Sequence, residues 1–501
     1  IIKDNIKFSC FTLGCKTNQS ESDYISRILM KKGFELVDLV DNPDFVIVNT
    51  CTVTSAADKK VRQLIRKIRN KSPDAKIVVT GCYEVFNKKF LTGSGVEFVV
   101  SNKNKYKIPK LICKTACVEK KSFNIPIPIE AKPIIRFPEK SEAENINTKE
   151  KYLLKNEYEY EYKYKRGDNF FHNRVLIKIQ DGCEQRCSYC IVPLVRGKYV
   201  STDCSKIINE INSIVKMGYE EIVITGIHIG KYGIDFNKKT INLKKSLDDQ
   251  GIANSGDLNK SDKRIGNLTG LLVEILNKTS IKRIRLSSIE INEISKNLIG
   301  LIRQSEGRIA RHLHIPLQSG SNRVLKLMNR SYDRQYFLDV INIIKDLIPQ
   351  ITITTDIIVG FPGETEGDFL ETIDLVKRAE FSKVHIFKYS KRPNTQAALF
   401  GRQIDEFEKS KRSSILREIS DQLRARFILQ NINHCLNVVC EETAGKGIEE
   451  GKIRACGKSE NYIEVYFDVT PVEFEKMKGK IVKVIAESRY KSGLFGSIIN
   501  V

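Results

Sequence analysis

The sequence predicts an α/β protein with three folded parts: an amino-terminal parallel α/β domain, a partial α/β barrel and a small carboxyl-terminal β-barrel. Short apolar segments alternate with amphipathic helical segments through most of the chain, which is typical of parallel sheets. One polar stretch of low complexity interrupts this alternation. Near the carboxyl terminus, short strands separated by glycines and polar turns replace it, as in small β-barrels.

Length and composition are those of a globular protein. The chain has 501 residues, of which 41% are hydrophobic and 29% charged, and this length suits about three domains. We find no apolar run of about 18 residues and no signal peptide, so we expect no membrane association. Thirteen cysteines in such a chain indicate a reducing compartment, where thiols bind metals, and we expect a cytoplasmic protein.

The charge predicts a polyanionic partner. The formal net charge is +22, and each Lys or Arg that contacts a phosphate releases counterions from it. A lysine-rich, solvated surface explains part of this excess.

Residues 1–125 are predicted to form the first α/β domain. Three apolar segments indicate strands, and two segments with helical spacing separate them. The predicted strands are Phe8–Leu13, Phe45–Val48 and Ile77–Thr80, and the predicted helices are Asn18–Lys32 and Ala56–Asn70.

A cysteine stands just after the end of each of these three strands. These residues are Cys15, Cys51 and Cys82. Because the carboxyl ends of parallel strands lie at one edge of a sheet, where ligands usually bind, we expect the three thiols to converge on a metal site. The alternative is three unrelated buried thiols, since free cysteine is common in protein cores.

Two polar segments are not predicted to form a core. Residues 126–172 begin with a proline-rich stretch and continue with alternating tyrosines and charges, which predicts a linker. Residues 236–266 interrupt the next domain and are predicted to form a surface loop.

Residues 173–427 repeat the strand–helix alternation and predict a full or partial α/β barrel. Six apolar segments supply its strands. They are Val175–Ile179, Glu221–Thr225, Arg283–Ser287, His312–Pro316, Ile351–Val359 and Lys383–Tyr389.

The first of these strands leads into three closely spaced cysteines, Cys183, Cys187 and Cys190. Their spacing is Cys-x3-Cys-x2-Cys. Three soft ligands on a short loop suit an iron–sulfur cluster, which normally takes four, so one iron would stay open to a substrate or cofactor. A structural zinc site is the alternative, but zinc sites usually contain two Cys-x2-Cys pairs or Cys–His mixtures, and no second pair is nearby.

Polar residues and glycines follow the other strands of this domain, at the edge where α/β barrels carry their functional groups. Glycines there could form only a turn, and Ser or Gln could only cap a helix. The candidates are Thr225, Gly226, Ser287, Gln318, Gly360, Gly363 and Glu364.

Residues 428–501 predict a small β module with strands Leu436–Glu442, Tyr462–Phe467 and Lys480–Glu487. Its size is similar to that of nucleic-acid-binding barrels, although a purely structural appendage also fits these residues.

The motifs together resemble a known family. Cys183-x3-Cys187-x2-Cys190, followed by Ile191-x-Pro193 and Arg196-Gly197, is similar to the cluster motif of the radical S-adenosylmethionine superfamily. Within it, the methylthiotransferases have an amino-terminal domain that resembles the segments Leu13-Gly14-Cys15, Asn49 to Thr54 and Thr80-Gly81-Cys82. The Asn-Thr-Cys-Thr-Val-Thr run and Tyr389-Ser-x-Arg392 resemble the branch that acts on N6-threonylcarbamoyladenosine in tRNA. The last module resembles the TRAM domain of this family only loosely.

The resemblance implies cofactors and site residues. Cys183, Cys187 and Cys190 would hold a 4Fe–4S cluster whose open iron binds S-adenosylmethionine, and Cys15, Cys51 and Cys82 would hold a second 4Fe–4S cluster. The seven strand-end residues would contact S-adenosylmethionine. Cys183, Cys187 and Cys190 would therefore be catalytic, because reduction of the cluster that they hold cleaves S-adenosylmethionine.

The resemblance also implies partners. The substrate would be tRNA, methylthiolated at C2 of N6-threonylcarbamoyladenosine on the 3′ side of the anticodon, and a reductant such as flavodoxin or ferredoxin would supply electrons. The sequence does not identify the sulfur donor. Two alternatives in the same superfamily are thiolation of isopentenyladenosine in tRNA and thiolation of a ribosomal-protein aspartate, which the charge of +22 suits less well. An alternative from another class is a zinc-stabilised RNA-binding protein without catalysis.

Overall fold

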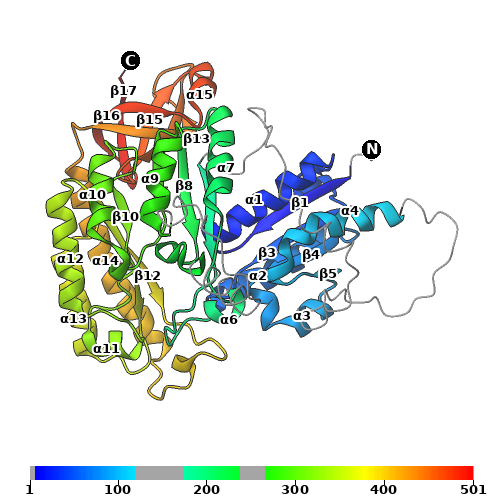
Figure 1. The fold of residues 1–501 in the computed structure, drawn as a ribbon, viewed down its shortest axis with the longest axis horizontal. Coiled ribbons are helices and arrows are strands. Elements are labelled where there is room, and N and C mark those ends of the chain that lie inside the picture. Colours follow the sequence, from blue (N-terminus) through cyan, green and yellow to red (C-terminus); the bar gives the residue numbers. More distant parts are fainter. Residues whose placement is uncertain (1–5, 120–173, 237–265, 500–501) are drawn as a thin grey trace, which may run out of the picture. The chain divides into compact units, whose positions relative to one another are not determined.

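The computed structural model describes residues 6–119, 174–236 and 266–499, which Figure 1 draws as a coloured ribbon. Contacts among them separate two units. The first unit contains residues 6–119 and 194–196, and the second contains residues 174–193, 197–236 and 266–499. The predicted linker 126–172 lies outside the described residues, as does nearly all of the predicted loop 236–266.

Within residues 6–119, five parallel strands form one sheet in the order β2-β1-β3-β4-β5. Its central strand is buried on both faces, as its unbroken apolar run predicts. Phe45 and Ile47 pack with helices α1 and α4, whereas Val46 and Val48 pack with helix α2. The elements are β1 (Lys7–Thr12), α1 (Lys16–Lys31), β2 (Glu35–Leu36), β3 (Phe45–Thr50), α2 (Ser55–Lys71), β4 (Lys76–Gly81), α3 (Lys88–Gly93), β5 (Phe98–Val99) and α4 (Ile108–Glu119).

The described part of the second unit contains six parallel strands that follow the order of the sequence. β6, β8 and β9 form one sheet, with β7 antiparallel at its edge, and β10, β11 and β12 form another. Parallel bridges between Ser288 and His314 and between Ile284 and Ile309 connect the two sheets. The strands are β6 (Val175–Asp181), β7 (Val200–Ser201), β8 (Glu221–Gly226), β9 (Arg283–Leu286), β10 (His312–His314), β11 (Thr352–Val359) and β12 (Lys383–Lys388).

A row of helices covers these strands, each in contact with the next around the sheet (Figure 1). Their apolar faces and the strands form one large core. The row consists of α7 (Cys204–Lys216), α9 (Leu268–Lys278), α10 (Lys296–Gln304), α12 (Arg334–Leu347), α13 (Glu366–Ala379) and α14 (Glu406–Leu429), and two short helices, α6 (Val192–Arg196) and α11 (Asn322–Leu327), lie in loops.

A closed five-stranded β-barrel ends the described chain, with strand order β13-β14-β15-β17-β16. The predicted fold class is therefore confirmed for all three folded parts. Two of the barrel strands, β14 and β17, are absent from the sequence-based prediction. The elements are β13 (Cys435–Lys446), β14 (Ile453–Ser459), β15 (Glu464–Val469), α15 (Pro471–Met477), β16 (Ile481–Tyr490) and β17 (Gly493–Ile498).

Candidate metal centres

The loop after β6 carries the three closely spaced cysteines. Gly182 opens it with a φ of +74°, and a Cβ at this position would lie 1.8 Å from the backbone oxygen of Lys198, so only glycine fits. The backbone N–H of Cys183 donates to the Gly197 oxygen at 2.9 Å, and that of Cys190 donates to the Cys187 oxygen at 3.0 Å. The first bond joins the start of the loop to the residue that follows α6, and the second closes a turn between Cys187 and Cys190.

The thiols of this loop are partly buried and influence one another. Burial raises the pKa of Cys190 to about 12, and negative charge on Cys187 and Cys183 raises it further. Burial also raises the pKa of Cys187, although the guanidinium of Arg330 acts in the opposite direction. Arg330 Nη1 donates to Cys187 Sγ at 3.2 Å, so a cation directly faces this sulfur.

A second set of side chains orients the groups beside these sulfurs. Arg330 forms an ion pair with Glu290, and its Nε donates to the Tyr332 hydroxyl at 3.1 Å. On the other side, His228 Nδ1 lies 3.6 Å from Cys183 Sγ, and its Nε2 lies 2.7 Å from Glu293. Burial lowers the pKa of His228, but the hydrogen bonds to Cys183 and Glu293 outweigh burial and raise it to about 9.

Four of the strand-end candidates lie on β8 and in the segments after β9 and β10. Thr225 and Gly226 end β8, and Thr225 is buried. The Ser287 hydroxyl is also buried, and no described residue provides it with a hydrogen-bond partner. Gln318 has a φ of +71°, and its backbone bridges to β11. Ser287 therefore has polar capacity left for a ligand.

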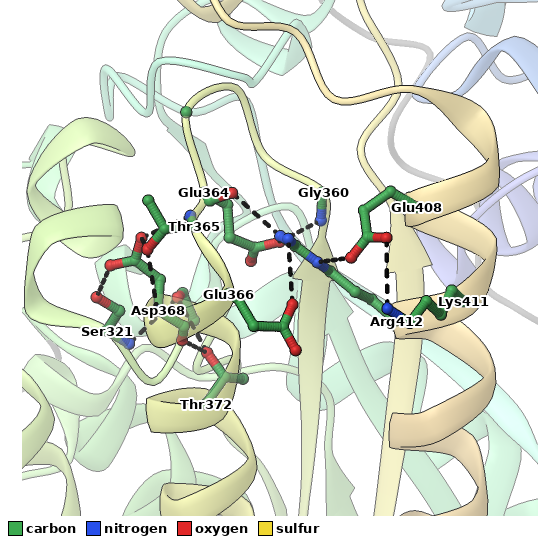
Figure 2. Close-up of polar contacts among 12 residues, drawn as sticks. Ser321, Gly360, Glu364, Thr365, Glu366, Asp368, Thr372, Glu408, Lys411 and Arg412 are labelled. Carbon is green, nitrogen blue, oxygen red and sulfur yellow. Dashed lines mark hydrogen bonds and ion pairs between the residues drawn. The ribbon is translucent and has the colours of Figure 1, made fainter.

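The other three candidates lie in the loop after β11, which Figure 2 shows in detail. The Glu364 carboxylate accepts the backbone N–H of Gly360 at 2.7 Å and Arg412 Nη1 at 2.6 Å. Arg412 also donates to the Glu364 backbone oxygen at 3.1 Å and to Glu408 at 2.8 Å. Glu364 thus closes the loop that contains Gly360 and Gly363 and ties it to α14.

Cys15, Cys51 and Cys82 lie just after β1, β3 and β4. These strands are neighbours in one parallel sheet, so their carboxyl ends share an edge. A Cβ on Gly14 would lie 3.3 Å from Cys51 Sγ, which shows how closely the first two segments approach. Burial raises the pKa of Cys51 to about 11, and negative charge on Cys82 and Cys15 raises it further.

A buried charge cluster lies beside these three cysteines in the first unit. Arg196 and Lys105 both pair with Glu21, at 2.6 Å and 2.7 Å, and the three side chains are at most 1% exposed. Burial raises the pKa of Cys82, whereas the positive charges of Arg196 and Lys105 lower it. The positive charges of Arg196 and Lys105 therefore favour the thiolate form of Cys82.

Two separate segments of the chain match different family models. Residues 7–100 match that of an uncharacterized protein family, UPF0004, and contain Cys15, Cys51 and Cys82. Residues 177–376 match that of the radical SAM superfamily and contain Cys183, Cys187 and Cys190.

Curated relatives cover nearly the whole chain. It is 36% identical to the threonylcarbamoyladenosine tRNA methylthiotransferase MtaB of Bacillus subtilis (strain 168), over 94% of this chain and 92% of that protein. It is 33% identical to the protein of the same name from Aquifex aeolicus (strain VF5), over 96% and 100%. The chain belongs to the radical S-adenosylmethionine methylthiotransferase family. It is also 32% identical to the tRNA-2-methylthio-N(6)-dimethylallyladenosine synthase of Natranaerobius thermophilus, over 83% and 82%.

Membership of the radical S-adenosylmethionine methylthiotransferase family implies a 4Fe–4S cluster and S-adenosylmethionine as cofactors. The residues of both centres fit iron–sulfur ligation, because each brings together three soft thiols and places cations beside them. Within the described ranges, no three His, Cys, Asp or Glu side chains converge on a point that one metal ion could occupy. A four-iron cluster has no need of such a point, since each cysteine binds a different iron.

Sequence analysis of this methylthiotransferase missed most of the charged groups around the thiols. Arg330 follows α11, Glu21 lies in α1 and Lys105 lies just before α4. No local sequence pattern connects these residues to a cysteine. His228 belongs to the notable strand-end run Thr225-Gly226-Ile227-His228, but nothing in that run predicts its contact with Cys183. No helix in the part of the chain that the structure describes is long and apolar enough to cross a membrane.

Proposed function

We propose that this protein attaches a methylthio group to C2 of N6-threonylcarbamoyladenosine in tRNA, on the 3′ side of the anticodon. The observation that carries this proposal is the pair of three-cysteine centres, each at the carboxyl edge of a parallel sheet. Two relatives that are named threonylcarbamoyladenosine tRNA methylthiotransferases are 36% and 33% identical to the chain over more than nine-tenths of its length.

The two centres have different proposed roles. Cys183, Cys187 and Cys190 would hold one 4Fe–4S cluster, and Cys15, Cys51 and Cys82 would hold a second. When bound, the first cluster with S-adenosylmethionine supplies radical chemistry that can replace an unactivated C–H bond, and the second supplies or holds sulfur. Such cofactors are needed because no side-chain acid or base readily removes the hydrogen from C2 of adenine.

The chain itself orients and compensates these groups. Arg330 places a positive charge beside Cys187, and His228, paired with Glu293, lies beside Cys183. Arg196 and Lys105 place positive charges near Cys82. We propose that Thr225, Gly226, Ser287, Gln318, Gly360 and Gly363 contact S-adenosylmethionine. Glu364, whose carboxylate is bound to Gly360 and Arg412, would shape that binding loop.

The net charge of +22 supports tRNA as the partner, because it suits a phosphate backbone. The target base would be unstacked to reach the site, as in other enzymes that act on bases. A reductant such as flavodoxin or ferredoxin would deliver electrons.

A second candidate function is methylthiolation of dimethylallyladenosine, also called isopentenyladenosine, in tRNA. It is favoured by 32% identity to a relative named as a synthase of 2-methylthio-N(6)-dimethylallyladenosine.

Nucleoside mass spectrometry of tRNA tests the proposal. In cells that lack this protein, we expect 2-methylthio-N6-threonylcarbamoyladenosine to disappear and N6-threonylcarbamoyladenosine to remain, and the wild-type gene should restore the product. Loss of the 2-methylthio derivative of isopentenyladenosine instead would reject the proposal and establish the second candidate.

A further inference from the structure

A buried histidine lies beside the first cysteine of the loop after β6. His228 follows β8, and its Nδ1 lies 3.6 Å from Cys183 Sγ. The other ring nitrogen, Nε2, lies 2.7 Å from Glu293, and the two side chains are 5% and 6% exposed. One imidazole ring therefore connects the sulfur of Cys183 to a buried carboxylate, and all three residues belong to the second unit.

The neighbours of this ring determine where its hydrogens lie. A cysteine that binds iron is a thiolate, which only accepts hydrogen bonds, and the carboxylate of Glu293 also only accepts them. Each ring nitrogen therefore carries a hydrogen, with Nδ1 facing Cys183 and Nε2 facing Glu293, so the ring is positively charged. A charged donor in a buried site acts on the sulfur much more strongly than the same donor in water.

The groups around the ring keep it in this orientation. Glu293 pairs with Lys231 at 3.2 Å as well as with His228. A Cβ on Gly230 would collide with Glu293 Oε2, so glycine at this position lets the carboxylate approach the ring. Tyr199 packs edge-on against the imidazole, with 5.8 Å between the ring centroids. The ring is thus held from more than one side.

One buried glutamine ties the histidine to the cysteine loop. Gln180 is 1% exposed, and its Oε1 accepts the backbone N–H of His228 at 2.7 Å. Its Nε2 donates to the backbone oxygen of Gly182 at 2.8 Å. Because Gly182 directly precedes Cys183, the same side chain fixes the backbone on both sides of the contact between Nδ1 and Sγ.

We propose that the hydrogen bond from His228 to Cys183 raises the reduction potential of the cluster held by Cys183, Cys187 and Cys190. Reduction adds one electron, which makes the sulfurs of the cluster more negative. A positively charged donor beside one of them stabilises the reduced form more than the oxidised form, and hydrogen bonds to the sulfurs are among the factors that set such potentials.

His228 would act through Cys183 and touch no reacting atom, so it is a positioning residue. The inference rests on the proposed role of Cys183 as a cluster ligand. Its consequence concerns the reductant, because a protein such as flavodoxin delivers electrons with a limited driving force. A cluster with a raised potential is reduced more often by such a partner, and only the reduced cluster cleaves S-adenosylmethionine.

A redox titration of the reconstituted full-length protein, followed by electron paramagnetic resonance, measures the potential. The signal of this cluster is the one that Cys187→Ala abolishes. In His228→Phe, which keeps a ring but loses both donors, we expect the equilibrium constant for reduction to fall about tenfold, which lowers the potential by about 59 mV for one electron. His228→Gln can donate one uncharged hydrogen bond and should give an intermediate potential, and it answers the same question if His228→Phe does not fold.

Formation of 5′-deoxyadenosine separates this role from a merely structural one. With flavodoxin as the reductant, His228→Phe should form it about tenfold more slowly, in proportion to the smaller reduced fraction. With an excess of titanium(III) citrate, a much stronger reductant, the rate should approach that of the wild type. His434→Phe is the control, because His434 is exposed and lies outside both three-cysteine centres, and it should change neither the potential nor either rate.

A wild-type potential in both His228 variants would overturn the proposal. Equal slowing of His228→Phe with the two reductants would also overturn it, because His228 would then only hold the loop in place. Cys183→Ala distinguishes these results from a failure of the proposed function. If this variant keeps the signal that Cys187→Ala abolishes, Cys183 is not a cluster ligand, and the cluster assignment and this proposal are both wrong. If it loses that signal while the His228 variants keep the wild-type potential, only this proposal fails.

Discussion

A single arginine connects helix α14 to the loop that follows β11. Arg412 reaches the carboxylate and the backbone oxygen of Glu364, and Glu364 in turn holds the N–H of Gly360 (Figure 2). Burial raises the pKa of Glu364, while Arg412 and the Gly360 N–H favour its charged form. Without the arginine, the loop would contain a buried carboxylate with no cation.

Substitution Arg412→Gln tests whether this contact positions the loop for S-adenosylmethionine. We expect the Kd for S-adenosylmethionine to rise by roughly tenfold, because a loosened loop loses about 1.4 kcal/mol of binding energy. Isothermal titration of the reconstituted protein measures this change, and Arg412→Lys should recover part of the affinity. The control is Lys411→Gln one residue earlier, since Lys411 is 54% exposed and only approaches Glu408 at 3.8 Å. A folded Arg412→Gln variant with wild-type affinity would contradict the positioning role.

Sequence reasoning at this scale found residues whose signal is local. The spacing of Cys183, Cys187 and Cys190 is a pattern within eight residues, and a strand end precedes each of the other three cysteines. Their cationic partners come from distant segments, so only the folded chain shows that Arg330 faces Cys187 and that Arg196 pairs with Glu21. The roles of the strand-end residues stay predictions.

At the scale of elements, three buried charges connect the parallel strands to the carboxyl-terminal barrel. Glu221 begins β8, and it pairs with Arg283 and Arg285 of the neighbouring strand β9. Arg283 also donates to the Asn437 backbone oxygen at 2.7 Å and Arg285 to that of Ser459 at 2.9 Å. All three side chains are at most 2% exposed, so each arginine depends on Glu221 for its charge balance.

The Glu221 carboxylate should make stability depend on pH in acid. Burial raises its pKa, but Arg285 and Arg283 outweigh burial and lower it from 4.5 to about 2. A depressed carboxylate pKa contributes stability that is complete above 4.5 and disappears as the pH falls toward 2. We expect Glu221→Gln to lower the free energy of unfolding at pH 7 by about 3–5 kcal/mol. Between pH 4.5 and pH 2, the free energy of unfolding of this variant should fall less steeply than that of the wild type.

Urea unfolding at several pH values measures this effect. Glu449→Gln is the control, because Glu449 is 70% exposed and its pair with Lys452 belongs to the class worth at most about 1 kcal/mol. Equal stability of Glu221→Gln and the wild type at pH 7 would show that the three charges do not stabilise this joint.

Most strands of more than two residues were predictable, whereas the two-residue strands β2, β5 and β7 and the barrel strands β14 and β17 were not. The strands β3, β4 and β8 contain unbroken apolar runs and β11 ends in one, and all four were predicted. β14 contains Arg454, Gly457 and Lys458, and β17 contains two glycines, so neither has the alternation typical of a strand. Barrel closure forms these strands, because each pairs with neighbours on both sides. The predicted strand His312–Pro316 shortens to His312–His314, since Pro316 has no N–H to pair.

At the scale of the whole molecule, each of the two units carries one three-cysteine centre. One centre lies at the ends of β1, β3 and β4, and the other lies in the loop after β6. We propose that the centre after β6 generates the radical and that the centre at the ends of β1, β3 and β4 serves carbon–sulfur bond formation. If so, the two activities should separate on mutation.

The most direct test is the product analysis of the Cys51→Ala variant, purified and assayed without oxygen with S-adenosylmethionine, a reductant and tRNA. The account predicts that 5′-deoxyadenosine still forms while the methylthio nucleoside does not, and that iron falls from about eight to about four per chain. Cys187→Ala should form neither product, and Cys435→Ala, an exposed cysteine outside both centres, should form both. Full methylthiolation by Cys51→Ala would contradict the assignment of radical generation and carbon–sulfur bond formation to two different centres.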